Sequence, residues 1–466
     1  MPAHATIRLS LVRHLRPAAA AVMAAVCLTA VTARSERVVV AASGDVATLE
    51  ALSPDITELV VVGDVAAPQL SYIASAFGSL RSLDLSDAAV VAFGGFERPG
   101  QPPHGPDTLP PMALASLRAA ELRLPASLRA LGAASLAGSA IESLELPAGV
   151  ETIAEGALAG CSRLRRVAAP GVRRVEAYAF SGCDSLAEVS LAALERVGLR
   201  AFAGCRALEA FDFAPTLSEL GEEAFAATPL REAELSPTSL TAIGPRAFAG
   251  CTSLAAVGLP QRLVGVGDGA FASVALDAAE FPEATDSIAP LAFAGAGSLA
   301  AVTLPPTLST IGASAFALCT ALDSIDAAAL AAVPALGPDV WEGVECGRVV
   351  LTAAPDMAAQ FLAAPQWREF AITWFSEVDS PAAAPAPSVR VCFDGALLLV
   401  ESSLPLESAR LYLISGRQVG EVSGAAPFVD ARFDTSPYAD RLYILALTPA
   451  KRDTTSSHTL TLKLLR

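Results

Sequence analysis

The residues best suited to chemistry are the cysteines, of which the chain has eight. Metal sites use Cys-x-x-Cys pairs or clusters of Cys and His at short spacing, and neither pattern occurs. Five cysteines instead recur in one register, each three residues after a large apolar residue: Cys161, Cys183, Cys205, Cys251 and Cys319. Because cysteine is among the most buried residue types, we predict a ladder of inert core thiols. Disulfides between neighbouring thiols are the alternative that an exported protein allows, and the pairing of Cys346 and Cys392 stays open.

Other catalytic patterns are missing. Beyond residue 33 the only histidines are His104 and His458, and neither His-Glu-x-x-His nor Gly-x-Ser-x-Gly occurs. The segment Gly265–Gly269 has the glycines of a phosphate loop but no lysine, and it falls on a turn of the repeat described below. A glycosidase needs only two facing carboxylates, so a hydrolase remains the less favoured alternative. We predict no catalytic residue, no metal and no cofactor.

A repeat of 22 to 23 residues organises the chain. A large apolar residue marks each unit and an aliphatic residue precedes it by five positions, while a proline ladder keeps the same phase. The large residues are Leu136, Leu158, Phe180, Phe202, Phe225, Phe248, Phe271, Phe293, Phe316 and Trp341. One such unit cannot bury its apolar face alone, but stacked units bury a continuous core with equivalent positions about 4.8 Å apart. The sequence therefore predicts a repeat solenoid of about ten units.

Each unit combines a strand, a turn and an apolar corner. Leu186–Leu191 alternates inward aliphatic and outward polar residues, as a half-buried strand does. Proline ends the strand because it cannot donate to the ladder. Glycine then follows the aliphatic residue, and we expect it to turn the chain with positive φ. These glycines are Gly132, Gly198, Gly221, Gly244, Gly267, Gly312 and Gly337.

The outward residues of these strands form the candidate binding face. They contain seven acids and one base, Arg166. We expect the acids to line up along one column and to repel one another unless a basic partner or cations relieve them. A merely solvated face is the alternative. The acids are Glu145, Glu188, Asp212, Glu232, Glu234, Glu280 and Asp326.

These units resemble BspA-like leucine-rich repeats, with the segments Ser239–Cys251 and Leu304–Phe316 carrying the match. The resemblance covers about residues 38–375 and implies a β-rich solenoid that acts on bacterial surfaces. It divides the chain into an N-terminal cap with a proline-rich loop at 34–112 and repeats at 113–375. The resemblance implies no asparagine ladder, and the chain contains no asparagine.

The segment after residue 375 no longer follows the repeat pattern. An Ala/Pro linker at 376–388 precedes short alternating runs at 389–466, which predict a small antiparallel β-sandwich. Gly416, Arg417 and Tyr443 resemble the C-terminal sorting domain of type IX (Por) secretion in Bacteroidetes. The resemblance implies an address for crossing the outer membrane. Ala439–Arg441 departs from the family, which usually has glycine there, and an ordinary accessory sandwich is the alternative.

The amino end is typical of an export signal. Residues 1–33 join a basic start, an apolar stretch and a small-residue cleavage motif. A lipoprotein signal at Cys27 is the alternative, although Val26 does not fit it. Cleavage leaves 29 basic and 48 acidic residues, a net charge of 29 − 48 = −19, which disfavours nucleic acid as a partner. No later segment has the ~18 apolar residues of a membrane helix.

These features predict an exported protein at the outer-membrane surface or outside the cell. The resemblance implies an adhesin-like function, with proteins or glycans of host matrix or of other cells as partners. The type IX secretion machinery would be a second partner. A structural surface coat without a specific ligand is the competing function.

Overall fold

A computed structural model of the chain describes residues 37–43, 46–92, 105–354, 357–374, 389–394, 397–413, 418–434, 442–449 and 460–465. The predicted export signal, the linker, His104, His458, Gly416 and Arg417 lie outside the described residues. The chain divides into two compact units. The first holds the chain up to Leu299 with Thr310–Thr320 and Leu336–Gly343, and the second holds Ala300–Ser309, Ala321–Ala335 and Val344–Arg466.

The first unit begins with a small α/β cap. Its parallel sheet has the order β1-β2-β3-β6, and β4 also pairs with β2. Two helices connect the strands, and in α3 the Gln69 side chain accepts the Ala66 backbone N–H at 2.8 Å. The cap elements are β1 (Arg37–Ser43), α2 (Ala47–Glu50), β2 (Glu58–Val65), α3 (Ala67–Ala76), β3 (Ser82–Asp84) and β4 (Ala88–Val90).

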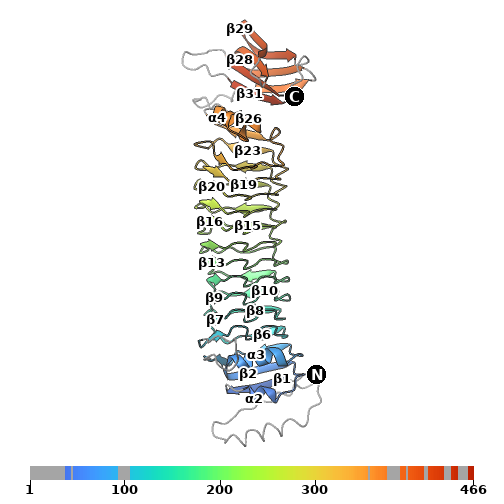
Figure 1. Cartoon of the computed structure of the whole chain (residues 1–466), viewed down its shortest axis with the longest axis vertical. Helices are drawn as coiled ribbons and strands as arrows, with labels where there is room; N and C mark the ends of the chain where they lie inside the picture. Colours follow the sequence, from blue (N-terminus) through green and yellow to red (C-terminus); the bar gives the residue numbers. More distant parts are fainter. Residues whose placement is uncertain are drawn as a thin grey trace, which may run out of the picture. The chain divides into compact units, whose positions relative to one another are not determined.

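Most rungs after the cap contribute two short strands, which stack in parallel as two columns (Figure 1). The first strands are β6 (Glu121–Arg123), β8 (Ser143–Glu145), β10 (Arg166–Ala168), β12 (Glu188–Ser190), β15 (Glu232–Glu234), β17 (Ala256–Gly258) and β19 (Ala278–Glu280). The second strands are β5 (Thr108–Leu109), β7 (Ala130–Leu131), β9 (Thr152–Ile153), β11 (Arg174–Val175), β13 (Arg196–Val197), β14 (Glu219–Leu220), β16 (Ala242–Ile243), β18 (Gly265–Val266), β20 (Ser287–Ile288) and β22 (Thr310–Ile311). The predicted solenoid is confirmed.

The solenoid begins one rung earlier than the sequence predicted. Strand β5 pairs with β7, with Leu109 opposite Leu131, and Leu114 is fully buried at the corner. Residues 105–111 therefore belong to the ladder, although six prolines in 97–111 suggested a loop. Pro110 takes the position that is glycine in seven of the later rungs.

The predicted large apolar residues fill the corners of the rungs. From Phe180 to Phe316 every phenylalanine of this ladder is at most 1% exposed, and each ring stacks on the next. Centroid distances between neighbouring rings run from 4.9 Å for Phe180–Phe202 to 5.7 Å for Phe225–Phe248. The stack ends with Trp341, 5.0 Å from Phe316. A continuous aromatic column therefore runs along the corners of the rungs from Phe180 to Trp341.

Positive φ angles occur at different positions from those we expected. The glycines that follow the aliphatic residue have ordinary φ. They are needed because a Cβ there would strike the backbone of the preceding rung: at Gly198 it would lie 2.7 Å from the Ala177 nitrogen. Left-handed residues instead stand two positions before and two after each corner residue, as at Tyr178 (φ 57°) and Gly182 (φ 70°). The two left-handed turns bend the chain around the corner.

The second unit contains the last strands of the repeat and a closing cap. Its parallel strands have the order β21-β23-β25-β26. The indole of Trp367 is buried and donates its Nε1–H to the Pro334 carbonyl at 3.2 Å. The elements are β21 (Ala301–Thr303), β23 (Ser324–Ala327), β25 (Val350–Ala353), α4 (Ala358–Ala363), the 3-10 helix η2 (Trp367–Glu369) and β26 (Ala371–Trp374), while β24 (Ala335–Leu336) lies where the chain passes between units.

The predicted C-terminal module is antiparallel. Strand β28 is long, and its two halves have different neighbours. Residues 397–402 pair with β27, residues 406–413 pair with β30, and register shifts separate the halves. This bend lets one hydrogen-bonded sheet fold over itself as a small sandwich. The strands are β27 (Val389–Asp394), β28 (Leu397–Leu413), β29 (Gln418–Asp434), β30 (Leu442–Pro449) and β31 (Leu460–Leu465).

Candidate binding face

Six of the seven predicted acids lie on first strands, Asp212 lies in the strand-free segment 210–212, and all seven are exposed. The strand register places them in two columns. Glu188 aligns with Arg166 and Ser143 in one column, and Glu145 aligns with Ala168 and Ser190 in the other. Glu232 and Glu234 belong to β15, and Glu280 to β19. Asp326 lies on β23 in the second unit, where it aligns with Thr303.

The acids do not form the continuous repulsive column that we expected. Small neutral residues interrupt this column. For example, the residue of β17 aligned with Glu234 is Gly258. Glu188 has a basic neighbour, Arg166, with 3.8 Å between Nε and Oε2. Glu234 accepts the Ser236 backbone N–H at 3.0 Å and its hydroxyl. No ion pair is described for Glu232 or Glu280 within the part of the chain that the structure covers.

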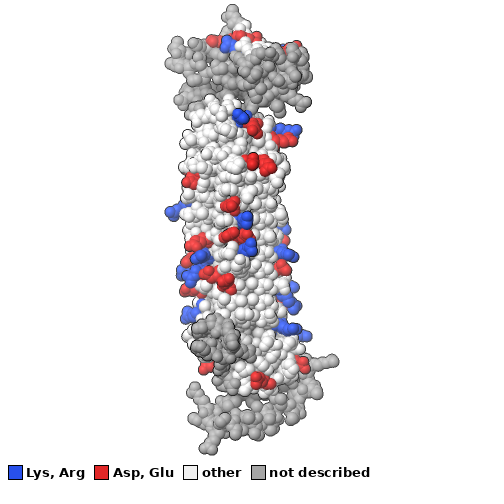
Figure 2. Space-filling model, in the orientation of Figure 1, with Lys and Arg blue, Asp and Glu red and all other residues white. Residues whose placement is uncertain are grey.

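Salt bridges between neighbouring rungs pair Glu188 and many acids outside the candidate face with arginines. Figure 2 shows basic and acidic side chains close together over the middle rungs. The pairs are Arg163–Glu142 (3.2 Å), Arg166–Glu188 (3.8 Å), Arg173–Glu195 (2.7 Å), Arg196–Glu219 (3.1 Å), Arg200–Glu223 (2.6 Å), Arg206–Asp184 (3.5 Å), Arg231–Glu209 (2.8 Å) and Arg246–Glu223 (3.8 Å). The hydrogen bond from Arg200 lowers the pKa of Glu223. Sequence reasoning missed these pairs, although a spacing of one repeat between Arg and Glu was a usable signal.

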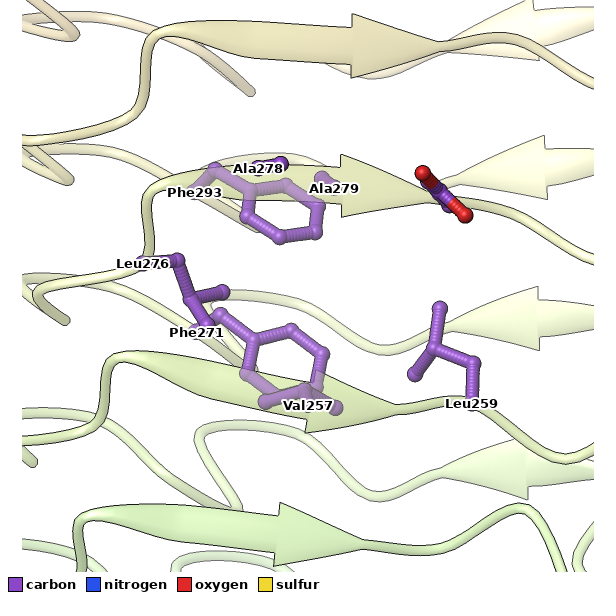
Figure 3. A pocket seen from close by; sticks show the side chains of 8 residues that line it. Val257, Leu259, Phe271, Leu276, Ala278, Ala279 and Phe293 are labelled. Atoms are coloured by element: carbon purple, nitrogen blue, oxygen red, sulfur yellow. The ribbon is translucent and has the colours of Figure 1, made fainter.

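The series of first strands is interrupted at three places in the first unit. β6 and β8 belong to different sheets, residues 210–212 form no strand, and β17 and β19 belong to different sheets. Between β17 and β19 lies a small apolar gap with about 10 Å³ of free space, room for about one water molecule. In Figure 3, Val257 lies on β17, Leu259 just after it, and Ala278 and Ala279 on β19, with the rings of Phe271 and Phe293 behind them. Leu276 and Glu280 complete the lining, and we name this site the β17–β19 slot.

The five cysteines of the repeat are buried free thiols, as predicted. Each Sγ–H donates to a carbonyl of the preceding rung, as from Cys183 to Leu158 at 3.1 Å. The carbonyl already accepts a backbone N–H, so the thiol gives it a second hydrogen bond, a role that sequence reasoning missed. Burial raises the pKa of Cys205 and of Cys319 to about 12, so both thiols are neutral near pH 7. Cys346 is also a buried free thiol, whereas Cys392 lies in β27.

The remaining predicted residues give no catalytic arrangement. Tyr443 lies in β30, where its backbone pairs with Leu413 and Leu464. Gly265 and Val266 form β18, and Gly269 has a φ of 59° at the corner, so the glycine-rich segment is part of a rung. Among the described residues no three His, Cys, Asp or Glu side chains are grouped to hold a metal ion. No described helix is long and apolar enough to cross a membrane.

Comparison with known proteins identifies the repeat. Residues 129–238 and 220–333 match the family described as the BspA type leucine-rich repeat region, in six copies. No curated protein matches the chain.

Solved structures of bacterial leucine-rich repeat proteins resemble the chain. One comes from Bacteroides ovatus, with 17% identity over 60% of this chain and 83% of its own and a TM-score of 0.37. Another is a leucine-rich cell surface protein from Faecalibacterium prausnitzii, with 18% identity, 58% and 78% coverage and a TM-score of 0.29. The pneumococcal vaccine antigen PcpA has 13% identity, 72% and 78% coverage and a TM-score of 0.36. Its stacked parallel strands make the repeat region a β-solenoid, and residues 129–333 of it match the BspA type leucine-rich repeat.

Proposed function

We propose that the protein is an adhesin-like binding protein of the cell surface, which recognises proteins or glycans of host matrix or of other cells. The face of β15, β17 and β19 carries the interaction. The main support is that the exposed acids Glu232, Glu234 and Glu280 lie on the first strands β15 and β19, and that Glu232 and Glu280 have no partner among the described ion pairs. A basic partner would supply the missing positive charge and would associate faster at low salt.

Reversing the charge of Glu232 and Glu234 tests the proposed face. We expect the variant Glu232→Lys/Glu234→Lys to bind about tenfold more weakly to whichever matrix protein or cell binds the mature chain. The melting temperature should barely change, because both side chains are exposed. Binding to a panel of purified matrix proteins and whole bacterial cells would be measured by surface plasmon resonance and cell pull-down.

The control variant Glu151→Lys/Glu155→Lys makes the same charge change at exposed positions outside the first strands. Equal losses in the two variants would show that only total charge matters, and the proposed face would be wrong. If no panel member binds the unaltered chain, the competing function of a structural surface coat is favoured.

We further propose that an export signal at 1–33 and the module at 389–466 bring the solenoid to the outside of the cell. The antiparallel strands β27–β31 support a separate C-terminal module. Deleting residues 389–466 should leave a folded solenoid in the periplasm of a type IX-competent host. Surface proteolysis and cell fractionation would locate it. Normal surface display of the truncated chain would rule out a sorting role for Gly416, Arg417 and Tyr443.

A further inference from the structure

We propose that the solenoid contains a hinge between two neighbouring rungs, formed by residues 208–227 and 230–250. At this hinge the rungs on the carboxyl side tilt against those on the amino side, about an axis along the corner that carries the aromatic column. Both rungs lie in the first unit. The tilt turns β15, β17 and β19 relative to β8, β10 and β12. This inference goes beyond the proposed binding function and does not depend on it.

Both strand ladders are interrupted between these two rungs. In the first column, residues 210–212 form no strand, and β15 pairs with β17 alone. In the second column, β14 ends one sheet and β16 begins the next. Every other pair of neighbouring rungs from β5 to β24 keeps at least one ladder. Where β17 and β19 belong to different sheets, for example, β18 still pairs with β20. The double interruption therefore marks one joint among the described rungs.

The backbone hydrogen bonds that remain across the joint are concentrated at the corner. They run from the N–H of Glu223 to Pro245 at 2.9 Å, of Phe225 to Ala247 at 2.8 Å and of Ala227 to Ala249 at 2.9 Å. Away from the corner, the described bonds across the joint come from Arg231 and Ser239. Gly244 makes no described bond to Leu220, although Gly267 donates to the equivalent carbonyl of its neighbour at 3.0 Å. The joint is therefore held along one edge and weakly along the others.

Apolar packing closes the sides of the joint that lack a ladder. Phe213 contacts Phe225 in its own rung and Phe248 across the joint, with ring centroids 5.3 and 6.2 Å away. The step from Phe225 to Phe248 is 5.7 Å, the longest between neighbouring phenylalanines of the column. A strand ladder fixes spacing and register through directed bonds, whereas apolar contacts are non-directional. The rings can therefore shift against one another while the corner bonds persist.

Two described ion pairs cross the joint without locking it. They are Arg231–Glu209 at 2.8 Å and Arg246–Glu223 at 3.8 Å, and both arginine side chains are exposed. Exposed ion pairs restrain a fold weakly. The pair of Arg246 and Glu223 also lies at the corner, on the hinge axis, where a tilt moves the chain least.

Native-state amide hydrogen exchange of the full chain tests the hinge, with single residues resolved by electron-transfer fragmentation. Arg231 donates to the Glu209 carbonyl at 3.1 Å across the joint, and Ala255 donates to Arg231 at 2.9 Å across a rung pair with both ladders. We expect a protection factor at least about tenfold lower for Arg231 than for Ala255. The corner amide of Phe225 should stay within about threefold of that of Phe180, since both donate at 2.8 Å.

Two outcomes of this measurement would contradict the hinge. Equal protection of Arg231 and Ala255 would mean that the joint is no weaker than its neighbours. A Phe225 amide as poorly protected as that of Arg231 would mean that the rungs separate instead of tilting. The comparison needs no substitution, so it holds whatever the folding of any variant.

A disulfide across the second column distinguishes a hinge from local fraying at Arg231. The variant Glu219→Cys/Ala242→Cys links the first residues of β14 and β16. The backbones approach closely there, since a Cβ on Gly244 would lie 2.7 Å from the Gly221 carbonyl oxygen. Because each rung tilts as a unit, the oxidised variant should protect the Arg231 amide about tenfold more than its reduced form does. Mass spectrometry would confirm the disulfide.

The matched control is Ser287→Cys/Thr310→Cys, which links aligned residues of β20 and β22. It closes a loop of the same length, so it restricts the unfolded chain equally. We expect it to change the protection of Arg231 by less than about twofold. Equal effects of the two disulfides, or no effect of the joint disulfide, would overturn the proposal. Binding to the matrix panel plays no part in these measurements, so their failure leaves the proposed function unaffected.

Discussion

Replacing Phe225 with alanine should lower the free energy of unfolding of the first unit by about 3 to 5 kcal/mol. The Phe225 ring is fully buried and stacks on Phe202 at 5.1 Å and on Phe248 at 5.7 Å. Phe211 and Phe213 also contact it edge-on. The substitution would leave a cavity in the aromatic column that the short strands around it cannot close, since each rung has a fixed backbone spacing.

Urea unfolding followed by circular dichroism would measure this loss. Because rungs contact only their neighbours, amide hydrogen exchange should accelerate most in the rungs on either side of residue 225. The control is Phe180→Leu, since Leu158 occupies the same position in the adjacent rung, and its cost should be about 1 kcal/mol. A loss of about 1 kcal/mol or less for Phe225→Ala would mean that the buried aromatic column does not stabilise the solenoid.

Gly244→Ala should destabilise the first unit by about 2 kcal/mol, although it adds a single methyl group. Gly244 has an ordinary φ, so conformational strain is not the reason. Its Cβ would lie 2.7 Å from the Gly221 carbonyl oxygen, and it would also strike the carbonyl oxygen of Leu220. Both are backbone atoms of the preceding rung, which cannot rotate away as a side chain would.

The matched control is again Gly265→Ala, which meets no atom closer than 3.4 Å and lies in the next rung. Thermal unfolding of the two variants would be compared. We expect a clearly lower melting temperature for Gly244→Ala and an unchanged one for the control. If Gly244→Ala unfolds like the unaltered chain, the rungs can separate enough to admit it and the close approach is not a constraint.

The charge pattern links stability to the proposed binding. Each exposed salt bridge between rungs contributes less than about 1 kcal/mol to the stability of the fold. The salt bridges nevertheless determine which acids remain available to bind a basic partner. Glu188 resembled Glu232 in the sequence, because both precede an inward residue of a strand. In the structure Arg166 neighbours Glu188, whereas Ala256 is aligned with Glu232. The candidate binding face is therefore narrower than the seven acids indicated.

The sequence by itself determined the solenoid, its period and its inward residues. Phe202, Ile243 and Cys251 were placed correctly because stacked identical units must align identical positions, and burial of apolar side chains decides which face points inward. It missed the rung at Leu114, where neighbouring prolines resemble those of a loop. Only the tertiary structure decided which arginine forms a salt bridge with which glutamate, since the pairing depends on the register between rungs. The same holds for Gly244, whose constraint is the backbone of another rung. The β17–β19 slot arises where Val257 and Ala279 fail to join one sheet, a property of how two rungs pack and not of either rung alone.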